Sequence, residues 1–214
     1  MRLRTIQQML DILHGFMVGR GTGTDIMELK LSQELARIDQ YPLFLVFMDL
    51  RKVYNTVDRD HLLITLEEYG VGPRMCGLLE TFWEFQHVVP RQKGLHGPAF
   101  PVTRGTTQGG LVSLTLFNVV VYNVIRTWMK IMVEDQRVAH DGLVETIWRC
   151  LGAFYANNAM VGSRGLDCLQ HAMNVMFILF RRYCLAANVT NLCTMRCQPK
   201  QLRTGVSEEA MTLK

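Results

Sequence analysis

Six consecutive apolar residues, from Leu43 to Met48, follow Pro42 and lead directly into the acidic residue Asp49. A continuous apolar run of this length, without alternating polar residues, is typical of a strand buried on both faces. The run therefore predicts a buried strand that ends at Asp49. A lone carboxylate at the end of such a strand suits an active site, or alternatively it caps the turn that follows.

The length and composition of the chain allow a sizeable core around that strand. With 214 residues, of which 49% are hydrophobic and 20% charged, the chain corresponds to one large domain or a domain and a half. These values exclude a disordered tail and a coiled coil. The formal net charge of +4 is compatible with a polyanionic partner but does not require one.

Membrane insertion and secretion are not expected from the sequence. The longest apolar stretch, Leu111 to Ile125, is interrupted by Ser113, Thr115, Asn118 and Asn123, so we expect no membrane span. The N-terminus has no signal-peptide core, which predicts an intracellular protein. Cys193 and Cys197 have no second cysteine or histidine pair nearby, so the cysteines are expected to be reduced thiols rather than zinc ligands.

Hydrophobic periodicity divides the rest of the chain into helices and short strands. Helices are predicted over residues 5–14, 25–38, 61–69, 77–85, 112–132 and 166–183, with Asp60 as the N-cap of the helix at 61–69. Two apolar segments, at 151–155 and 159–162, predict a β-hairpin with Asn157 and Asn158 at its tip. Asparagine is common in tight turns, so this pair has a purely structural explanation.

Residues 88–103 alternate in polarity and contain several prolines and glycines, which predicts edge strands joined by turns. The segment and its flank are basic, through Arg91, Lys93 and Arg104. Contact with nucleic acid is one interpretation of these cations, and a solvated hairpin is the other.

Four motifs resemble those of reverse transcriptases, the RNA-directed DNA polymerases, in particular the enzymes of non-LTR retrotransposons and group-II-intron-like elements. Residues 47–58 resemble F-x-D-L-x-K-A-[FY]-D-x-[VL]-D, and residues 104–113 resemble R-G-x-x-Q-G-D-P-[LV]-S. Residues 154–158 stand where the family has F-Y-A-D-D, and residues 14–21 are similar to H-G-F-R-x-G-R-G. The motifs occur in the order that the family has.

The resemblance implies an α+β fold: a polymerase palm, with an antiparallel sheet and helices packed on one face, plus part of the fingers and no thumb. It divides the chain into a fingers-side segment at 1–40, the palm strand and first catalytic motif at 41–58, and a fingers or palm insertion at 59–107. The palm helix, hairpin and following helix occupy 108–198, and a flexible tail occupies 199–214.

The family's reaction, also implied by the resemblance, is template-directed DNA synthesis by phosphoryl transfer with two divalent ions. The expected partners are an RNA template, a DNA primer, deoxynucleotides and Mg²⁺ or Mn²⁺. Asp49 corresponds to a metal-binding catalytic aspartate, and Asn157 and Asn158 occupy the two other catalytic positions. The residues expected to bind the nucleotide are Leu50, Lys52, Val53, Tyr54, Gln108 and Gly109.

The sequence departs from the family where the metal ions bind. Asn157 and Asn158 replace two aspartates, and Thr190-Asn191 replaces the usual Gly-Lys. An amide brings no charge to a divalent cation, which proteins hold mainly through carboxylates and substrate phosphates. We therefore expect metal binding to be weak or lost and polymerisation to be absent.

Three interpretations stay open at this point: an inactive palm left over from a retroelement, a palm reused as a nucleic-acid-binding or scaffolding module, and a weak Mn²⁺-dependent enzyme. Asp58 is expected to begin a helix rather than to bind a metal. Apolar surface left without its fingers and thumb predicts self-association of the isolated chain.

Overall fold

The computed structural model describes residues 15, 19–51, 53–107, 110–135 and 152–197, and these form two compact units. The first unit takes the described residues within 1–51 and 121–214, and the second takes those within 52–120. The predicted helix at 5–14, most of the loop at 133–143 and the tail after Pro199 lie outside the described residues. The five functional segments named above remain a prediction.

The first unit is built on a four-stranded antiparallel sheet with the strand order β6-β7-β1-β8. Its strands are β1 (Leu43–Asp49), β6 (Gly152–Tyr155), β7 (Asn158–Ser163) and β8 (Cys193–Cys197). The predicted strand and the predicted hairpin are thus confirmed. Strand β8 was not expected from the sequence, because four of its five residues are exposed and give no apolar pattern.

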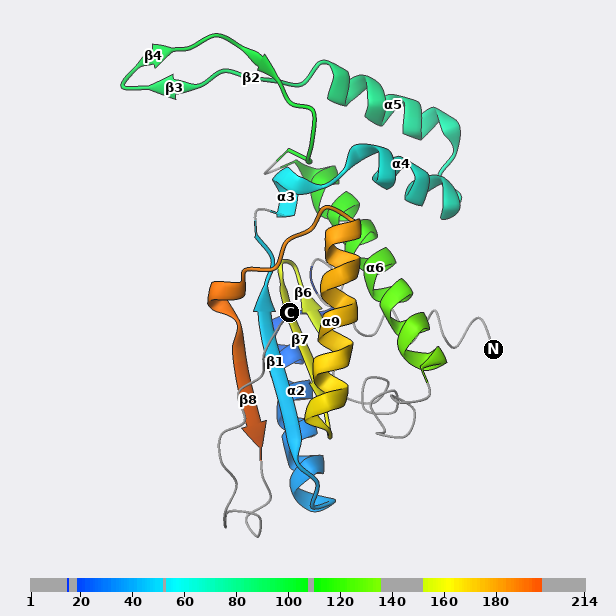
Figure 1. The fold of residues 1–214 in the computed structure, drawn as a ribbon. Helices are drawn as coiled ribbons and strands as arrows, with labels where there is room; N and C mark the ends of the chain where they lie inside the picture. The colour runs from blue at the N-terminus through cyan, green and yellow to red at the C-terminus, as the bar shows by residue number, and fades with distance from the viewer. Residues whose placement is uncertain (1–14, 16–18, 52, 108–109, 136–151, 198–214) are drawn as a thin grey trace. The chain divides into compact units, whose positions relative to one another are not determined.

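Helices cover both faces of this sheet (Figure 1). On one face, Ala36 of α2 (Thr22–Ile38) forms a buried cluster with Leu43, Leu45 and Met160. On the other face, Val46 and Val161 lie opposite each other and are both 0% exposed, and α9 (Leu166–Arg182) packs against β7. The α+β architecture with an antiparallel sheet is confirmed, but the helices are not confined to one face as expected.

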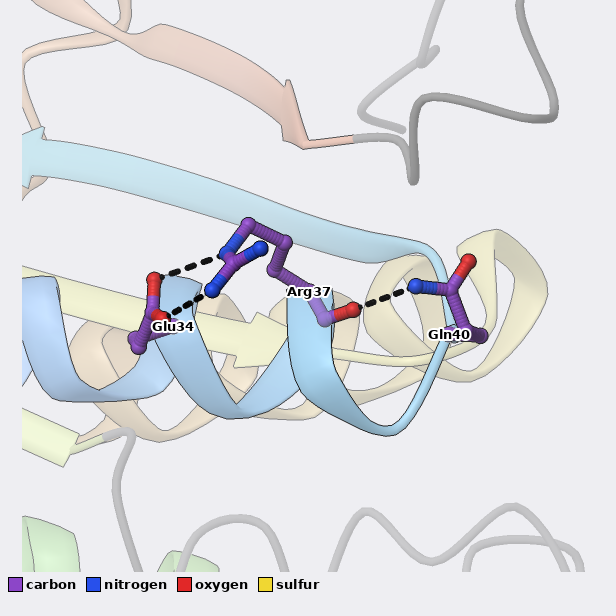
Figure 2. A network of polar contacts seen from close by, with 3 residues as sticks. All are labelled: Glu34, Arg37 and Gln40. Carbon is purple, nitrogen blue, oxygen red and sulfur yellow. Dashed lines mark hydrogen bonds and ion pairs between the residues drawn. The ribbon is translucent and has the colours of Figure 1, made fainter.

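Helix α2 begins three residues earlier than the sequence indicated, at Thr22 after Gly21, and not at Asp25. Its C-terminal end is shown in Figure 2, where Arg37 forms an ion pair with Glu34 at 2.5 Å and the Gln40 amide donates to the carbonyl of Arg37 at 2.6 Å. The bond from Arg37 holds the pKa of Glu34 below its ordinary value. Gln40 adopts a φ of 57°, and the Tyr41 amide donates to Ala36, which ends the helix and directs the chain into β1.

Helix α6 (Leu111–Glu134) runs through both units, and its later part packs in the first. There the indole of Trp128 donates to the carbonyl of Ala172 in α9 at 2.8 Å, and Asn123 donates to the hydroxyl of Tyr183. Residues Val112–Glu134 are long and apolar enough to cross a membrane by length and composition alone. More than half of its most apolar 18-residue window is buried inside the protein, as expected for a core helix. Of its polar side chains, Ser113 and Asn123 are buried, whereas Arg126 and Lys130 are exposed.

The second unit contains the short helix α3 (Val53–Thr56) and the helices α4 (Arg59–Glu68) and α5 (Pro73–Glu84). It also contains two short ladders and the start of α6. The N-cap of α4 is Asp58, not Asp60 as predicted, because its carboxylate accepts from the amides of Asp60 and His61. The bond from the His61 amide is the main reason that the pKa of Asp58 is lowered. This confirms the interpretation of Asp58 as a helix-start residue.

Arg59 joins α4 to two other segments of the second unit, the end of α5 and residues 102–105, through neutral acceptors. It donates to the carbonyls of Gly105 at 2.9 Å and Val102 at 2.5 Å, and to the side chain of Gln86 at 2.5 Å. Its guanidinium lies 5.3 Å from the centroid of the Trp83 ring. Burial lowers the pKa of Arg59, and no carboxylate among the described residues pairs with it. Arg59 therefore fixes the turn at Gly105 against α4 and α5.

The C-x₃-C pair lies on strand β8, where an extended chain separates the two Cα atoms by about 13 Å. Such a separation is too large for a disulfide or for a shared metal ion. The Gln33 amide contacts the sulfur of Cys197, whose pKa is raised by burial. Within the described part of the chain, Cys76, Cys193 and Cys197 carry free thiols.

Candidate functional site

The β6–β7 hairpin brings Asn157 and Asn158 beside Asp49. In the pairing of β1 with β7, Asp49 lies directly opposite Asn158. The Leu50 amide continues this pairing by donating to the carbonyl of Asn157 at 2.7 Å. The carbonyl of Asp49 accepts from the Asn188 amide at 2.6 Å. The backbone on both sides of Asp49 is therefore fixed, and the three sequence-predicted residues lie together.

The hairpin turn contains a residue in an unfavourable backbone conformation. Tyr155 and Asn158 are the last paired residues, so Ala156 and Asn157 form a two-residue loop. Ala156 has a φ of 54°, and Asn157 has no positive φ, which is the pattern of a type II′ turn. Glycine is the usual residue at that position, and an alanine there costs about 1–2 kcal/mol. Surrounding contacts must therefore hold the turn.

The Asn157 side chain is bonded to Asp49 itself. Its Nδ2 atom donates to Oδ1 of the Asp49 carboxylate. A carboxylate at position 157 has no hydrogen to donate, so this bond depends on the amide. Among Asp49, Asn157 and Asn158, only Asp49 carries a charge, and one of its oxygens already accepts the amide. No cluster of three or more metal-binding side chains occurs among the described residues.

A pocket of about 430 Å³ opens beside this group in the first unit. Its polar residues are Asp25, Asp49, Asn158 and Asn191. Its apolar residues come from α2, β1 and the hairpin: Ile26, Leu29, Phe47, Met48, Tyr155, Ala159 and Met160. Asn191 belongs to the segment that replaces the family's Gly-Lys, so this segment lies at the same pocket.

Gly15 lies against the hairpin turn, which explains why the motif at residues 14–21 has a glycine at this position. Its amide donates to the carbonyl of Phe154 at 3.1 Å. A Cβ atom on Gly15 would lie 2.2 Å from the nitrogen of Ala156 and 3.0 Å from the carbonyl carbon of Tyr155. Both are backbone atoms, so only a residue without a side chain allows this approach.

Substitution of Gly15 with alanine is expected to displace the hairpin tip and to lower the free energy of unfolding by about 2–3 kcal/mol, through strain in a packed region. Hydrogen exchange at the Leu50 amide, which donates to Asn157, should become faster. Gly23→Ala is the matched control, since no atom lies within 4 Å of its Cβ position and Gly23 is inside α2. That control lies in the first turn of α2 and should change the free energy of unfolding by less than about 1 kcal/mol. Unchanged exchange at Leu50 in Gly15→Ala would contradict the positioning role.

The expected nucleotide-binding residues fall into both units. Leu50, in the first unit, is buried and bridges to Ala187. In the second unit, Val53 is buried at the start of α3, and the Tyr54 ring lies 5.3 Å from that of Phe117. Burial raises the pKa of Tyr54. Lys52, Gln108 and Gly109 lie outside the described residues.

The residues expected to contact nucleic acid all belong to the second unit. Arg91 lies on β3 (Arg91–Gln92), and Lys93 follows it in the turn to β4 (Leu95–His96). Arg104 lies beside the glycine-rich turn, and all three side chains are exposed. Sequence reasoning missed Gly15 and Arg59. The signal for Gly15 was its place in a motif, whereas nothing in the sequence marked Arg59.

The chain is similar to one known protein family. The model of the family described as reverse transcriptase (RNA-dependent DNA polymerase) matches residues 1–202. No protein of curated function matches the chain.

Solved structures of telomerase share the fold. The apo telomerase of Candida tropicalis truncated from its C-terminal domain has a TM-score of 0.61 at 9% identity, over 91% of this chain and 40% of that one. Telomerase from Candida albicans, in complex with a TWJ fragment of telomeric RNA, has a TM-score of 0.67 at 10% identity, over 91% of this chain and 33% of that one. This chain thus spans about a third to two fifths of the telomerase chains. Since the family model matches nearly its whole length, the chain belongs to the reverse transcriptase (RNA-dependent DNA polymerase) family.

Proposed function

We propose that this chain is a reverse-transcriptase palm with part of the fingers, derived from a non-LTR retrotransposon or group-II-intron-like element, that no longer synthesises DNA. The four ordered motifs support the retroelement origin, in particular the similarity of residues 14–21 to the fingers-side motif of those elements. The packing of Gly15 on the hairpin supports it further, because it gives that motif a structural role.

The hydrogen bond from Asn157 to Asp49 is the observation that supports the loss of activity. A two-ion centre needs several carboxylates directed at the same cations. Here the amide hydrogen points at Asp49, where a cation would have to bind, and Asn158 opposite adds no charge. The residues present therefore do not fit a pair of Mg²⁺ or Mn²⁺ ions.

Primer extension on an RNA template with a DNA primer and deoxynucleotides tests this proposal. The chain as it exists should give no product with Mg²⁺ or with Mn²⁺, whereas Asn157→Asp combined with Asn158→Asp should extend the primer. Product from the unaltered chain that disappears in Asp49→Ala would overturn the proposed inactivity and establish a weak enzyme. No product from either protein would leave the inactivity standing and would count against the two amides as its sole cause.

A second candidate function is a non-catalytic nucleic-acid-binding module. Exposed cations in the second unit favour it, because Arg91, Lys93 and Arg104 form no ion pair with any described residue. The Candida albicans telomerase with a similar fold is in complex with RNA, which is consistent with an RNA partner for this chain. Self-association is a further proposal, supported by the exposed Met75, Leu78 and Phe82 along α5.

A further inference from the structure

The second unit carries a β-arm, His87–Pro101, made of two consecutive ladders. Strand β2 (His87–Val88) pairs with β5 (Phe100–Pro101), and β3 pairs with β4. At its tip, Lys93 and Gly94 have φ values of 47° and 85°, as in a type I′ turn. The Gly97 amide donates to the carbonyl of Pro90 at 2.8 Å and links the two ladders. Figure 1 shows the arm extending from the end of α5. The arm is therefore an ordered projection.

The β-arm contains no acidic residue. All six acids of the second unit precede it in the sequence: Asp58, Asp60, Glu67, Glu68, Glu80 and Glu84. After Glu84 the next acid is Glu134, so the cations Arg91 and Lys93, and Arg104 just beyond the arm, have no carboxylate nearby in the sequence. Before the arm, these six acids outnumber the cations Lys52, Arg59 and Arg74, whereas the arm itself carries cations and no acid.

The register of the arm brings basic side chains together. Arg91 lies directly opposite His96, so the two share one face of the β3–β4 ladder. The Arg91 guanidinium donates several hydrogen bonds and the His96 ring carries an N–H donor, so the two side chains can bind one anionic group together. No described acid lies opposite them in the ladder. The geometry is therefore suited to an external polyanion.

Apolar and aromatic side chains are exposed on the same arm. Phe100 lies opposite Val88, and these residues are 50% and 43% exposed, while Leu95 near the tip is 77% exposed. Proteins that bind single-stranded nucleic acid combine cations along the backbone with exposed rings on which bases stack. In a duplex the bases are already stacked, so an exposed phenylalanine has less to bind.

We propose that the β-arm binds single-stranded nucleic acid, with Arg91 and Lys93 on phosphates and Phe100 against a base. The inference rests on the nucleic-acid-binding candidate above and requires neither Asp49 nor a metal ion.

Fluorescence anisotropy with labelled oligouridine, oligothymidine and an RNA duplex, each of about 20 nucleotides, tests the inference. The full chain is titrated between about 50 and 200 mM KCl. Arg91→Gln with Lys93→Gln should weaken oligouridine binding about tenfold. It should also reduce the slope of log affinity against log salt by about 1.4, which corresponds to two lost phosphate contacts on a single strand. Comparison of oligouridine with oligothymidine shows whether the bound single strand is RNA or DNA.

Lys30→Gln with Lys130→Gln is the charge-matched control, since both lysines are exposed on helices of the first unit. This control should leave the affinity within about twofold and the slope unchanged. Phe100→Ala should weaken single-strand binding by about fivefold or more without changing the slope. Thermal unfolding of each variant confirms that it is folded.

The outcomes separate this inference from the proposals on which it rests. If the unaltered chain binds no nucleic acid, both the proposed nucleic-acid-binding function and the proposed role of the β-arm are wrong. If the arm variants do not weaken binding, or if the control variant weakens it equally, only the proposed role of the β-arm is wrong. The arm is then a solvated hairpin. Tighter binding of the duplex, with no effect of Phe100→Ala, overturns the preference for single strands.

Discussion

Asn157→Asp is expected to give the chain a divalent-cation site that the unaltered chain lacks. The substitution removes the hydrogen-bond donor at Asp49 and places a second carboxylate beside it. At an effective dielectric near 20, a carboxylate about 4 Å from a divalent ion contributes on the order of 8 kcal/mol of gross attraction. If desolvation leaves about 3 kcal/mol, the affinity for Mn²⁺ rises about a hundredfold. Mn²⁺ titration followed by electron paramagnetic resonance measures this directly.

The order of the single variants is part of the prediction. Asn158→Asp adds a carboxylate opposite Asp49 but leaves the bond from Asn157 in place, so its gain in Mn²⁺ affinity should be smaller. Asn157→Asp should also lower the melting temperature without metal, because two carboxylates then repel each other, and Mn²⁺ should restore it. Asn174→Asp on α9 is the control for charge alone and should bind no more Mn²⁺ than the unaltered chain. Equal affinities in all variants would show that the amide does not limit metal binding.

Gly105→Ala is expected to destabilise the second unit strongly. Gly105 has a φ of 81°, and a Cβ there would lie 2.4 Å from the carbonyl oxygen of Tyr54 and 2.7 Å from Cα of Asn55. Its amide also donates to the carbonyl of Val57 at 2.8 Å, so the turn cannot move away without losing that bond. The backbone strain and the overlap together should cost about 3 kcal/mol or more. Thermal unfolding should show a decrease in melting temperature of about 6–12 °C.

Gly70→Ala separates the cost of backbone strain from the cost of steric overlap. Gly70, at the end of α4, has a φ of 86° but no atom within 4 Å of its Cβ position. The substitution should therefore lower the free energy of unfolding only through backbone strain, by about 1 kcal/mol. If Gly105→Ala lowers the melting temperature no more than Gly70→Ala does, the close approach of Gly105 to Tyr54 and Asn55 does not constrain the turn.

The elements that the sequence predicted well are those with a long apolar pattern. The run before Asp49 indicated a doubly buried strand, and the segments around Asn157 indicated the hairpin, because each carries its own apolar signal. The positions at which helices begin were predicted less accurately. Asp60 and Asp58 are both plausible caps on composition, and only the hydrogen bonds from the Asp60 and His61 amides identify Asp58.

The sequence alone determined the family and the order of the elements before β8, because motif spacing and hydrophobic periodicity are local properties of the chain. Only the tertiary structure decided which distant groups meet. The bond from Asn157 to Asp49 joins residues 108 positions apart, and the contact of Gly15 with Ala156 is longer still in sequence. The bonds of Arg59 are of the same kind. Such contacts depend on how strands pair and turns pack, and no pattern of neighbouring residues encodes them.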